Sequence, residues 1–298
     1  MGSALLLGFG AAVVVAVTAS ILLATRIARP ISELAAASER VAHGDYSRPV
    51  PAAAGELGEL AASFNGMAAS LAANEQRRRD LIGDVAHELR TPIASVRGYV
   101  DGLQAGVFMP GPDAWRVLDE QTTRLAHLVD DLALLWRAES HDLRLDLAVL
   151  DGAALLADVR ERSRGVAASR SVELALGPMA PARVRADPVR LAQVLDNLVG
   201  NALRYTPAGG HVELGLARSG ADALITVRDD GPGLTPEQVA KVFDRFYRAE
   251  PSRSRDAGGS GLGLAITKSL LEAMGGSVAV TSAGIGRGAT FTVQLPAG

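Results

Sequence analysis

The hydrophobic pattern begins with an apolar segment of 21 residues, 4–24, that contains no charged side chain. A helix of this length rises about 30 Å, which is the thickness of a bilayer hydrocarbon core. We therefore predict a transmembrane helix. A cleaved signal peptide is the alternative, but it needs a basic region, and only the terminal amine precedes Leu5. Arg26 and Arg29 follow at once, so the positive-inside tendency places the rest of the chain in the cytoplasm.

Two short helical seams, joined by a linker over residues 48–55, follow the apolar segment. The first seam ends at a break over residues 43–45, and the second has apolar positions at alternating steps of three and four residues, which is a heptad pattern. We predict a parallel coiled-coil module within a dimer, while the periodicity equally allows a plain stalk. The apolar positions are Ile27, Ile31, Leu34 and Val41 in the first seam, and Leu57, Leu60, Phe64, Met67 and Leu71 in the second.

A third helical stretch, residues 77–104, carries four apolar side chains seven residues apart: Ile82, Leu89, Val96 and Leu103. A helix over residues 113–138 follows a turn rich in Gly and Pro, and its seam contains Leu118, Leu125, Leu128, Leu132 and Leu135. The two stretches predict a helical hairpin that buries its seams in a dimeric four-helix bundle.

His87 lies on the outer face of the first helix of this hairpin, although a structural core histidine belongs on the apolar stripe. Neutral imidazole is nucleophilic near pH 7, and a carboxylate such as Glu88 fixes its tautomer. Thr91 shares the surface of His87 one turn later, and we expect Pro92 to bend or loosen the helix. A metal site is disfavoured because no other histidine pairs with His87 at helical spacing.

Beyond about residue 151 strands and helices alternate. This pattern predicts an α+β sandwich, with one mixed sheet and helices on one face. The expected strands are residues 172–176, 211–217, 223–228, 277–281 and 290–295, and the expected helices are residues 188–205, 236–243 and 262–274.

Polar side chains follow two of these elements. Asn197 and Asn201 lie one turn apart, where amide oxygens could hold a hydrated Mg²⁺, and Arg204 adds a cation. For this helix alone, capping or a polar network explains the asparagines better. Asp229 ends an apolar strand before a glycine-rich turn, and its carboxylate could accept from an exocyclic amine such as that of adenine. An ordinary turn explains this segment equally well.

A second glycine-rich segment, residues 258–264, precedes a helix whose N-terminus attracts phosphate. It lacks the spacing of a P-loop, and it does not follow the first strand of a βαβ unit, so both of these nucleotide folds are disfavoured. Residues 286–291 contain further glycines, which a hairpin turn also explains. Between the turn after Asp229 and residues 258–264, aromatic residues anchor an arginine-bearing loop that we interpret as a lid, with a plain exposed loop as the alternative: Phe243, Phe246, Tyr247, Arg248, Arg253 and Arg255.

Composition narrows the function classes further. The chain has 298 residues, enough for about two domains, and is 48% hydrophobic but 4% aromatic. Its 30 basic and 33 acidic residues give a net charge of −3, which argues against a nucleic-acid partner. The absence of cysteine excludes disulfides, thiolate nucleophiles and Cys-ligated metals, and fits a reducing compartment.

Together, the order and spacing of these segments resemble a membrane sensor histidine kinase of two-component systems. The implied fold is multidomain: a transmembrane helix, a parallel coiled-coil HAMP linker, an antiparallel hairpin in a dimeric four-helix bundle, and an α+β ATP-binding sandwich. The predicted domains are residues 4–24, 26–74, 75–140 and 151–298. Residues 85–92 resemble the phosphoacceptor box, 197–205 the N box, 229–233, 259–263 and 286–291 the three glycine boxes, and 243–247 the aromatic box.

This resemblance implies that His87 accepts the γ-phosphoryl group of ATP while Glu88 polarises its imidazole. The phosphoryl group would then pass to an aspartate in the receiver domain of a cytoplasmic response regulator. Asn201 would coordinate Mg²⁺ with help from Asn197, and Asp229 would accept from adenine. The remaining nucleotide-binding residues would be Arg204, Tyr205, Gly231, Gly233, Phe243, Gly259, Gly261, Leu262 and Gly263.

The resemblance also implies a homodimer in a bacterial plasma membrane, single-pass, with its catalytic domains in the cytoplasm. The spacing of Glu88 and Thr91 matches the family pattern for dephosphorylating the regulator. Arg204 stands where lysine is usual. The usual extracytoplasmic sensor is missing, so we expect a truncated start, or sensing within the membrane or through a partner. The alternatives are a non-catalytic signalling scaffold and a related hydrolytic ATPase, which carries Glu where this chain has Asn197.

Overall fold

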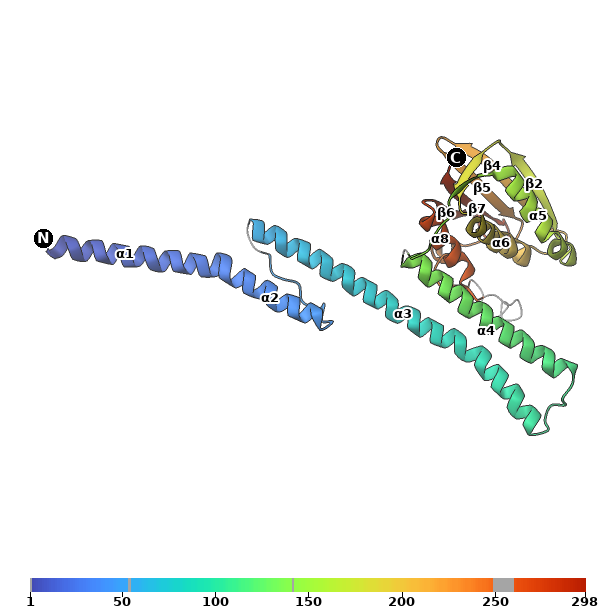
Figure 1. Ribbon diagram of the computed structural model, residues 1–298, viewed down its shortest axis with the longest axis horizontal. Helices are drawn as coiled ribbons and strands as arrows, with labels where there is room; N and C mark the ends of the chain where they lie inside the picture. The colour runs from blue at the N-terminus through green and yellow to red at the C-terminus, as the bar shows by residue number, and fades with distance from the viewer. Residues whose placement is uncertain (1, 53–54, 141, 249–259) are drawn as a thin grey trace. The chain divides into compact units, whose positions relative to one another are not determined.

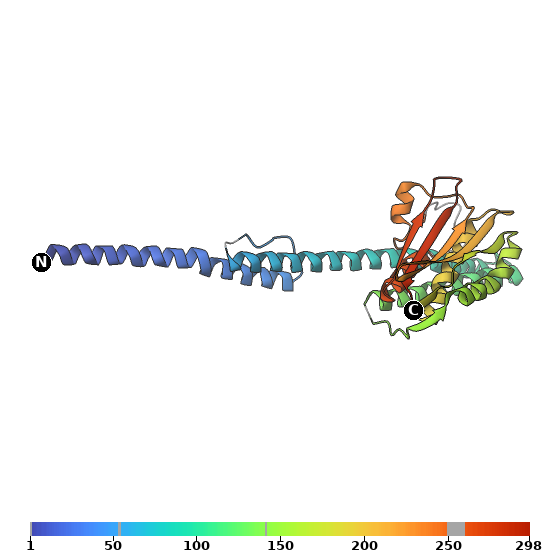
Figure 2. The same ribbon diagram turned by 90° about the horizontal axis from the view of Figure 1, so that it is seen from above.

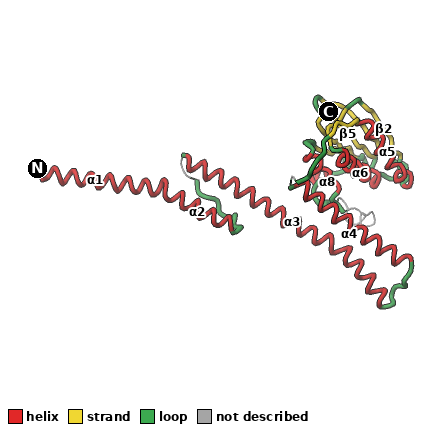
Figure 3. Tube along the Cα trace, viewed as in Figure 1, coloured by secondary structure: helices red, strands yellow, loops and turns green. Residues whose placement is uncertain are grey.

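The computed structural model describes residues 2–52, 55–140, 142–248 and 260–298 (Figure 1). The chain divides into two parts, residues 1–87 and 88–298. Strands occur only in the second part of the described chain, where Figure 3 shows them in yellow.

The first part starts with a long helical run over the predicted apolar segment. Helix α1 (Gly2–Leu23) continues through a π-helical turn, η1 (Ala24–Ala28), into α2 (Arg29–Ala42). Among the described residues, Gly8–Ala42 is the one stretch long and apolar enough to cross a membrane, by length and composition. The predicted helix over the apolar segment is therefore confirmed, and it does not break at the arginines.

Helix α3 (Glu56–Gln104) joins two stretches that the apolar pattern separates. The polar run over residues 75–80 interrupts the apolar pattern, but Glu, Gln and Arg are good helix formers, so the helix continues through it. Pro92 lies inside α3, where it removes one backbone donor without ending the helix.

A folded connector links α2 to α3, and both views show the two helices side by side and running in the same direction (Figure 1, Figure 2). Val50 of the connector is buried with Ala37 and Ala61. The Asn65 side chain holds the backbone of Val50 at both ends: its Oδ1 accepts from Val50 N at 2.8 Å, and its Nδ2 donates to Val50 O at 2.9 Å. These contacts favour a folded module over a plain stalk.

In the second part, the end of α3 and helix α4 (Pro112–Glu139) form the predicted hairpin. The turn between them is fixed on α3. Val107 N and Phe108 N donate to Gly102 O at 2.8 and 3.1 Å, and the Phe108 ring stacks on Tyr99 with centroids 5.0 Å apart. The helical expectation for residues 113–138 is confirmed to within one residue at each end.

The C-terminal domain is a mixed sheet covered on one face by helices. Its strands are β2 (Glu173–Met179), β4 (His211–Ser219), β5 (Asp222–Asp229), β6 (Ser277–Thr281) and β7 (Ala289–Pro296), in the order β2-β4-β5-β7-β6. Strand β2 pairs parallel with β4, and the other pairs are antiparallel. Helices α5 (Gly152–Ser169), α6 (Pro188–Tyr205) and α8 (Gly263–Ala273) pack on the sheet, and α7 (Pro236–Lys241) precedes the aromatic segment.

The predicted mixed sheet is confirmed, but three elements were missed. Strands β1 (Ala148–Asp151) and β3 (Arg183–Ala186) pair with each other and have four residues each, too few for a periodic pattern. Helix α5 has a weak apolar stripe because alanine, arginine and glycine occupy many of its positions.

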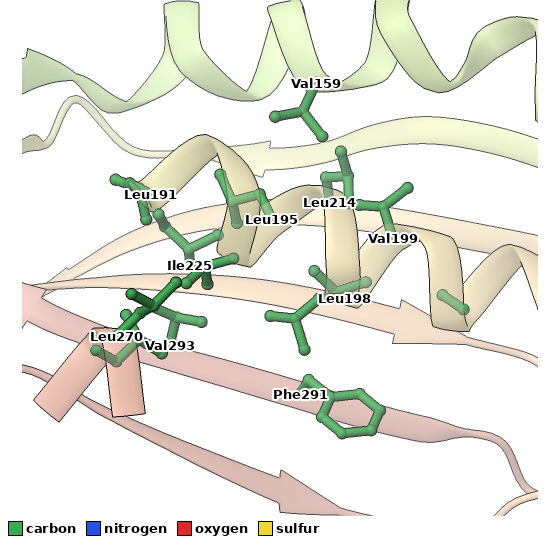
Figure 4. Packing of buried hydrophobic residues seen from close by; sticks show 14 of the residues in the cluster. Val159, Leu191, Leu195, Leu198, Val199, Leu214, Ile225, Leu270, Phe291 and Val293 are labelled. Carbon is green, nitrogen blue, oxygen red and sulfur yellow. The ribbon is translucent and has the colours of Figure 1, made fainter. Parts of the chain in front are cut away.

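The core of this domain lies between α6, α8 and the sheet (Figure 4). Leu191, Leu195 and Leu198 recur on one face of α6, and every second residue of β7 is buried. Asp187 starts α6: its Oδ1 accepts from Val189 N at 2.9 Å, and its Oδ2 accepts from Asp146 N at 2.9 Å. The packing turns the opposite, polar face of α6 outward.

Candidate functional site

The predicted phosphoacceptor lies on the solvent side of α3. His87 is exposed, while the seam residues Val85 and Leu89 are partly buried. Glu88 is half-buried, and Thr91 is exposed one turn beyond His87. Among the contacts of the described residues, no hydrogen bond joins Glu88 to the imidazole, so this pairing stays a prediction.

The polar face of α6 meets the N-terminus of α8. Asn197, Asn201 and Arg204 are each partly exposed, and Tyr205 is exposed at the end of the helix. Asn197 Nδ2 donates to Gly263 O at 3.3 Å. This bond uses the amide nitrogen, so the amide oxygen of Asn197 can act as an acceptor or ligand.

Asp229 ends β5 as a buried carboxyl with its two oxygens in different roles. Its Oδ1 accepts from Gly231 N at 2.8 Å and from Ala289 N at 3.3 Å. Neither of these donors reaches Oδ2. Burial raises the pKa of Asp229, and the negative charge of Asp230 adds to this effect, although the two backbone donors act in the opposite direction. The geometry therefore leaves Oδ2 as a hydrogen-bond acceptor with a fixed direction.

The first and third glycine boxes pack against each other beside this carboxyl. Gly288 N donates to Gly231 O at 3.2 Å, and Gly286 N donates to Pro232 O at 2.6 Å. Gly233 has a φ of +71°, and a Cβ there would lie 2.1 Å from Gly284 O. The two predicted glycine boxes are thus in backbone contact with each other.

The aromatic segment adjoins the second glycine box. The Phe243 ring meets Phe291 edge-on with centroids 6.3 Å apart. Phe246 adopts a left-handed φ of +58° and donates its N–H to Gly261 O at 3.0 Å. A Cβ on Gly261 would lie 2.8 Å from Phe246 Cα, so only glycine fits. Leu262 is buried at the start of α8.

Three residues of the predicted lid and glycine box lie outside the described residues, namely Gly259, Arg253 and Arg255. The structure does not test their predicted roles.

Helix α4 contacts the segments that frame the second glycine box. Ser260 Oγ donates to Asp131 Oδ2 at 3.2 Å and accepts from Leu262 N at 3.3 Å. The Arg245 guanidinium pairs with Glu139, with Nε at 3.1 Å from Oε1. Burial raises the pKa of Asp131, although the bond from Ser260 acts to lower it. Each of these two contacts joins residues more than a hundred positions apart, so spacing within one segment does not predict it.

Three family profiles match successive parts of the chain: the HAMP domain matches residues 22–73, the His Kinase A (phospho-acceptor) domain residues 77–141, and the histidine kinase-, DNA gyrase B-, and HSP90-like ATPase family residues 186–298. The signal transduction histidine-protein kinase BaeS of Escherichia coli K12 is 37% identical over 286 residues. The chain belongs to the sensor histidine kinase family. The match covers 96% of this chain and 61% of BaeS, so this chain spans less than two thirds of that relative.

Two solved structures share the fold. Histidine kinase AdeS of Acinetobacter baumannii matches with a TM-score of 0.61 at 28% identity, over 70% of this chain and 97% of AdeS. Full-length ShkA, solved in complex with AMPPNP, matches with a TM-score of 0.55 at 29% identity, over 73% of this chain and 46% of ShkA. The predicted series of an apolar helix, a HAMP module, a helical hairpin and an α/β ATPase domain is confirmed.

The amide oxygens on the outer face of α6 fit a magnesium ion that is shared with a nucleotide. The described residues include no group of three or more His, Cys, Asp or Glu side chains that could hold a metal by themselves. Mg²⁺ is commonly held by one or two protein oxygens together with substrate phosphates. The amide oxygens of Asn201 and Asn197 on the outer face of α6 suit that mode of binding.

Proposed function

We propose that this chain is an ATP-dependent protein histidine kinase. It transfers the γ-phosphoryl group of ATP to His87 and then to an aspartate in the receiver domain of a cytoplasmic response regulator. One observation carries the proposal: an exposed histidine lies within the segment that matches the phospho-acceptor family, on a chain that also contains the ATPase domain.

The nucleotide role rests on the geometry around Asp229. Its Oδ2 would accept from the adenine amine, while the amide groups of Gly261, Leu262 and Gly263 at the start of α8 would bind phosphate oxygens. Gly231, Gly233 and Phe243 would frame the base, and Arg204 and Tyr205 would border the phosphates. The matched structure of ShkA is a complex with AMPPNP, which supports a nucleotide ligand for this chain.

Asn201, assisted by Asn197, would hold Mg²⁺, which would neutralise charge on the triphosphate. The protein's own part in phosphoryl transfer is to position the reactants. Glu88 would bind one nitrogen of the His87 imidazole and leave the other nitrogen free to attack. Asn197 stands where the related hydrolytic ATPases carry a glutamate base, which favours transfer to His87 over attack by water.

The hairpin exposes an apolar stripe on α4 beside the predicted seam, whose Leu128 and Leu135 are buried. Trp115, Val129 and Trp136 lie seven or fourteen residues apart on α4 and are 60%, 54% and 63% exposed, and Ile82 on α3 is 54% exposed. Such a stripe is buried in a coiled bundle. We propose a homodimer that is anchored by a single-pass helix in a bacterial plasma membrane, with its catalytic domains in the cytoplasm. Its proposed domains are the transmembrane helix (4–24), the HAMP linker (26–74), the dimerisation and phosphotransfer domain (75–140) and the ATP-binding domain (151–298).

Labelling with γ-labelled ATP and Mg²⁺ tests the kinase proposal on the full chain in detergent. We expect label on the protein that is lost in acid and stable in alkali, as a phosphoramidate is, and that passes to a receiver domain when one is added. Steady ATP hydrolysis without labelled protein would instead support the hydrolytic ATPase, and neither label nor hydrolysis would support the scaffold.

We further propose that the chain dephosphorylates its regulator, with Thr91 orienting the attacking water. Thr91 is exposed on the same helix face as His87, one turn beyond it. Thr91→Ala should lower regulator dephosphorylation by about 10- to 100-fold and leave autophosphorylation intact, because the lost hydroxyl takes no part in the attack by imidazole. Thr91→Ser keeps the hydroxyl and should retain most of the activity. An unchanged dephosphorylation rate in Thr91→Ala would refute the role.

A further inference from the structure

Ser282 lies just after β6, outside the phosphoacceptor, N, aromatic and glycine boxes, and its hydroxyl contacts both glycine-rich loops beside Asp229. Ser282 Oγ accepts from Leu234 N at 3.0 Å and from Gly284 N at 3.3 Å, and it donates to Gly288 O at 2.7 Å, with Gly284 O as a longer second acceptor at 3.4 Å. A hydroxyl has one proton and two acceptor positions, so the two accepted bonds and the short bond to Gly288 O use its whole capacity.

The bond to Gly288 leads directly to the Asp229 carboxyl. The next backbone N–H, that of Ala289, donates to Asp229 Oδ1 at 3.3 Å. Gly288 N donates to Gly231 O, and Gly231 N is the second donor to Asp229 Oδ1. Gly288 O and Ala289 N–H belong to the same peptide unit. Ser282 therefore holds that peptide unit by its carbonyl, while its N–H donates to Asp229 Oδ1.

The bond to Leu234 holds the other loop at the same point. Where the loops meet, a Cβ on Gly233 would lie 2.1 Å from Gly284 O and 3.2 Å from Ser282 Oγ. Buried or half-buried backbone groups need partners, and the Ser282 hydroxyl supplies them for both loops. Because Ser282 bonds to both loops, its loss frees both donors to Asp229 Oδ1 to shift.

We propose that Ser282 is a positioning residue that sets the direction of Asp229 Oδ2 and thereby the preference for adenine over a purine that lacks the amine. This inference rests on the proposed nucleotide role of Asp229. Ser282 itself contacts no nucleotide atom in this proposal and acts through Ala289 and Gly231.

Calorimetry with ADP and IDP, with Mg²⁺ and the full chain in detergent, separates positioning from a merely structural role. IDP carries a carbonyl oxygen where ADP has its amine, so only ADP gains from a correctly aimed Oδ2. We expect wild type to bind ADP more tightly than IDP. Ser282→Ala should weaken ADP binding about tenfold and change IDP binding little, so that the ratio of the two affinities falls.

Two variants serve as controls, and the melting temperature of each is measured. Ser282→Thr keeps the hydroxyl and should retain most of the ADP preference. Ser277→Ala removes an exposed hydroxyl from β6 and should leave both affinities unchanged. If the ratio of ADP affinity to IDP affinity is unchanged in Ser282→Ala, whether both affinities fall equally or neither falls, the positioning role alone is overturned. Equal binding of ADP and IDP by wild type would overturn the adenine role of Asp229 as well.

Discussion

Replacing His87 with glutamine should reduce labelling from ATP roughly a thousandfold or more, because an amide nitrogen has no lone pair free to attack phosphorus. His87 is exposed on α3, so the change removes no core packing. We therefore expect the melting temperature and the affinity for ADP to match those of wild type. The measurement is acid-labile, alkali-stable label on the full chain, alongside calorimetric ADP binding.

His127→Gln is the matched control for this experiment. His127 is also an exposed helical histidine in the hairpin, on α4 rather than α3. We expect it to keep full labelling. Label that persists in His87→Gln and disappears in His127→Gln would move the phosphoacceptor to α4, and label that persists in both would place it on another residue.

The elements that the sequence predicts well are those whose determinants are local. Helix α6 begins and ends where the pattern predicts, because Asp187 caps it, Pro188 fits its first turn, and one face recurs as an apolar stripe. Apolar spacing does not predict the continuity of α3, because residues 75–80 are polar and are helical through their intrinsic propensity.

The site is harder to predict because its contacts join distant positions. Asp229 Oδ1 accepts from a residue 60 positions away, and Asn197 bonds to one 66 positions away. The hydrophobic periodicity of a segment does not show which distant residues pair with it. The resemblance supplied the motif residues, but Ser282 and Asp131 fell outside those motifs. Their roles depend on how loops and helices meet, which the spacing of residues within one segment does not show.

Asp229→Asn should separate nucleotide affinity from stability. The asparagine Oδ1 can still accept from Gly231 N and Ala289 N, but its amide nitrogen then points where Oδ2 did. A donor would face the donating amine of adenine. We expect ATP affinity to fall roughly 100-fold, the scale for leaving a polar pair unmatched in a buried site. Calorimetry on the full chain measures this loss, and Asp230→Asn, which changes an exposed neighbour, should bind ATP as wild type does.

The ligand-free Asp229→Asn variant should be as stable as wild type or more stable, although it binds ATP less tightly. Since burial raises the pKa of Asp229, the folded state holds this proton more tightly than the unfolded chain does. The resulting stabilisation is complete below the unfolded pKa, about 4, and is lost as pH rises through the folded pKa. At neutral pH the buried charge therefore weighs against folding. Asparagine carries no charge, so we expect Asp229→Asn to melt at or above the wild-type temperature at pH 7, and thermal scans across acid and neutral pH should show a weaker pH dependence than wild type.

The two measurements together decide what the buried carboxylate is for. A group that holds the loops together should lower stability and affinity together when it is changed, whereas a group kept for a ligand should lower affinity alone. A buried charge that opposes folding at working pH persists where binding requires it. A drop in melting temperature that accompanies the lost affinity would make Asp229 a structural link between the glycine boxes rather than the residue that recognises adenine.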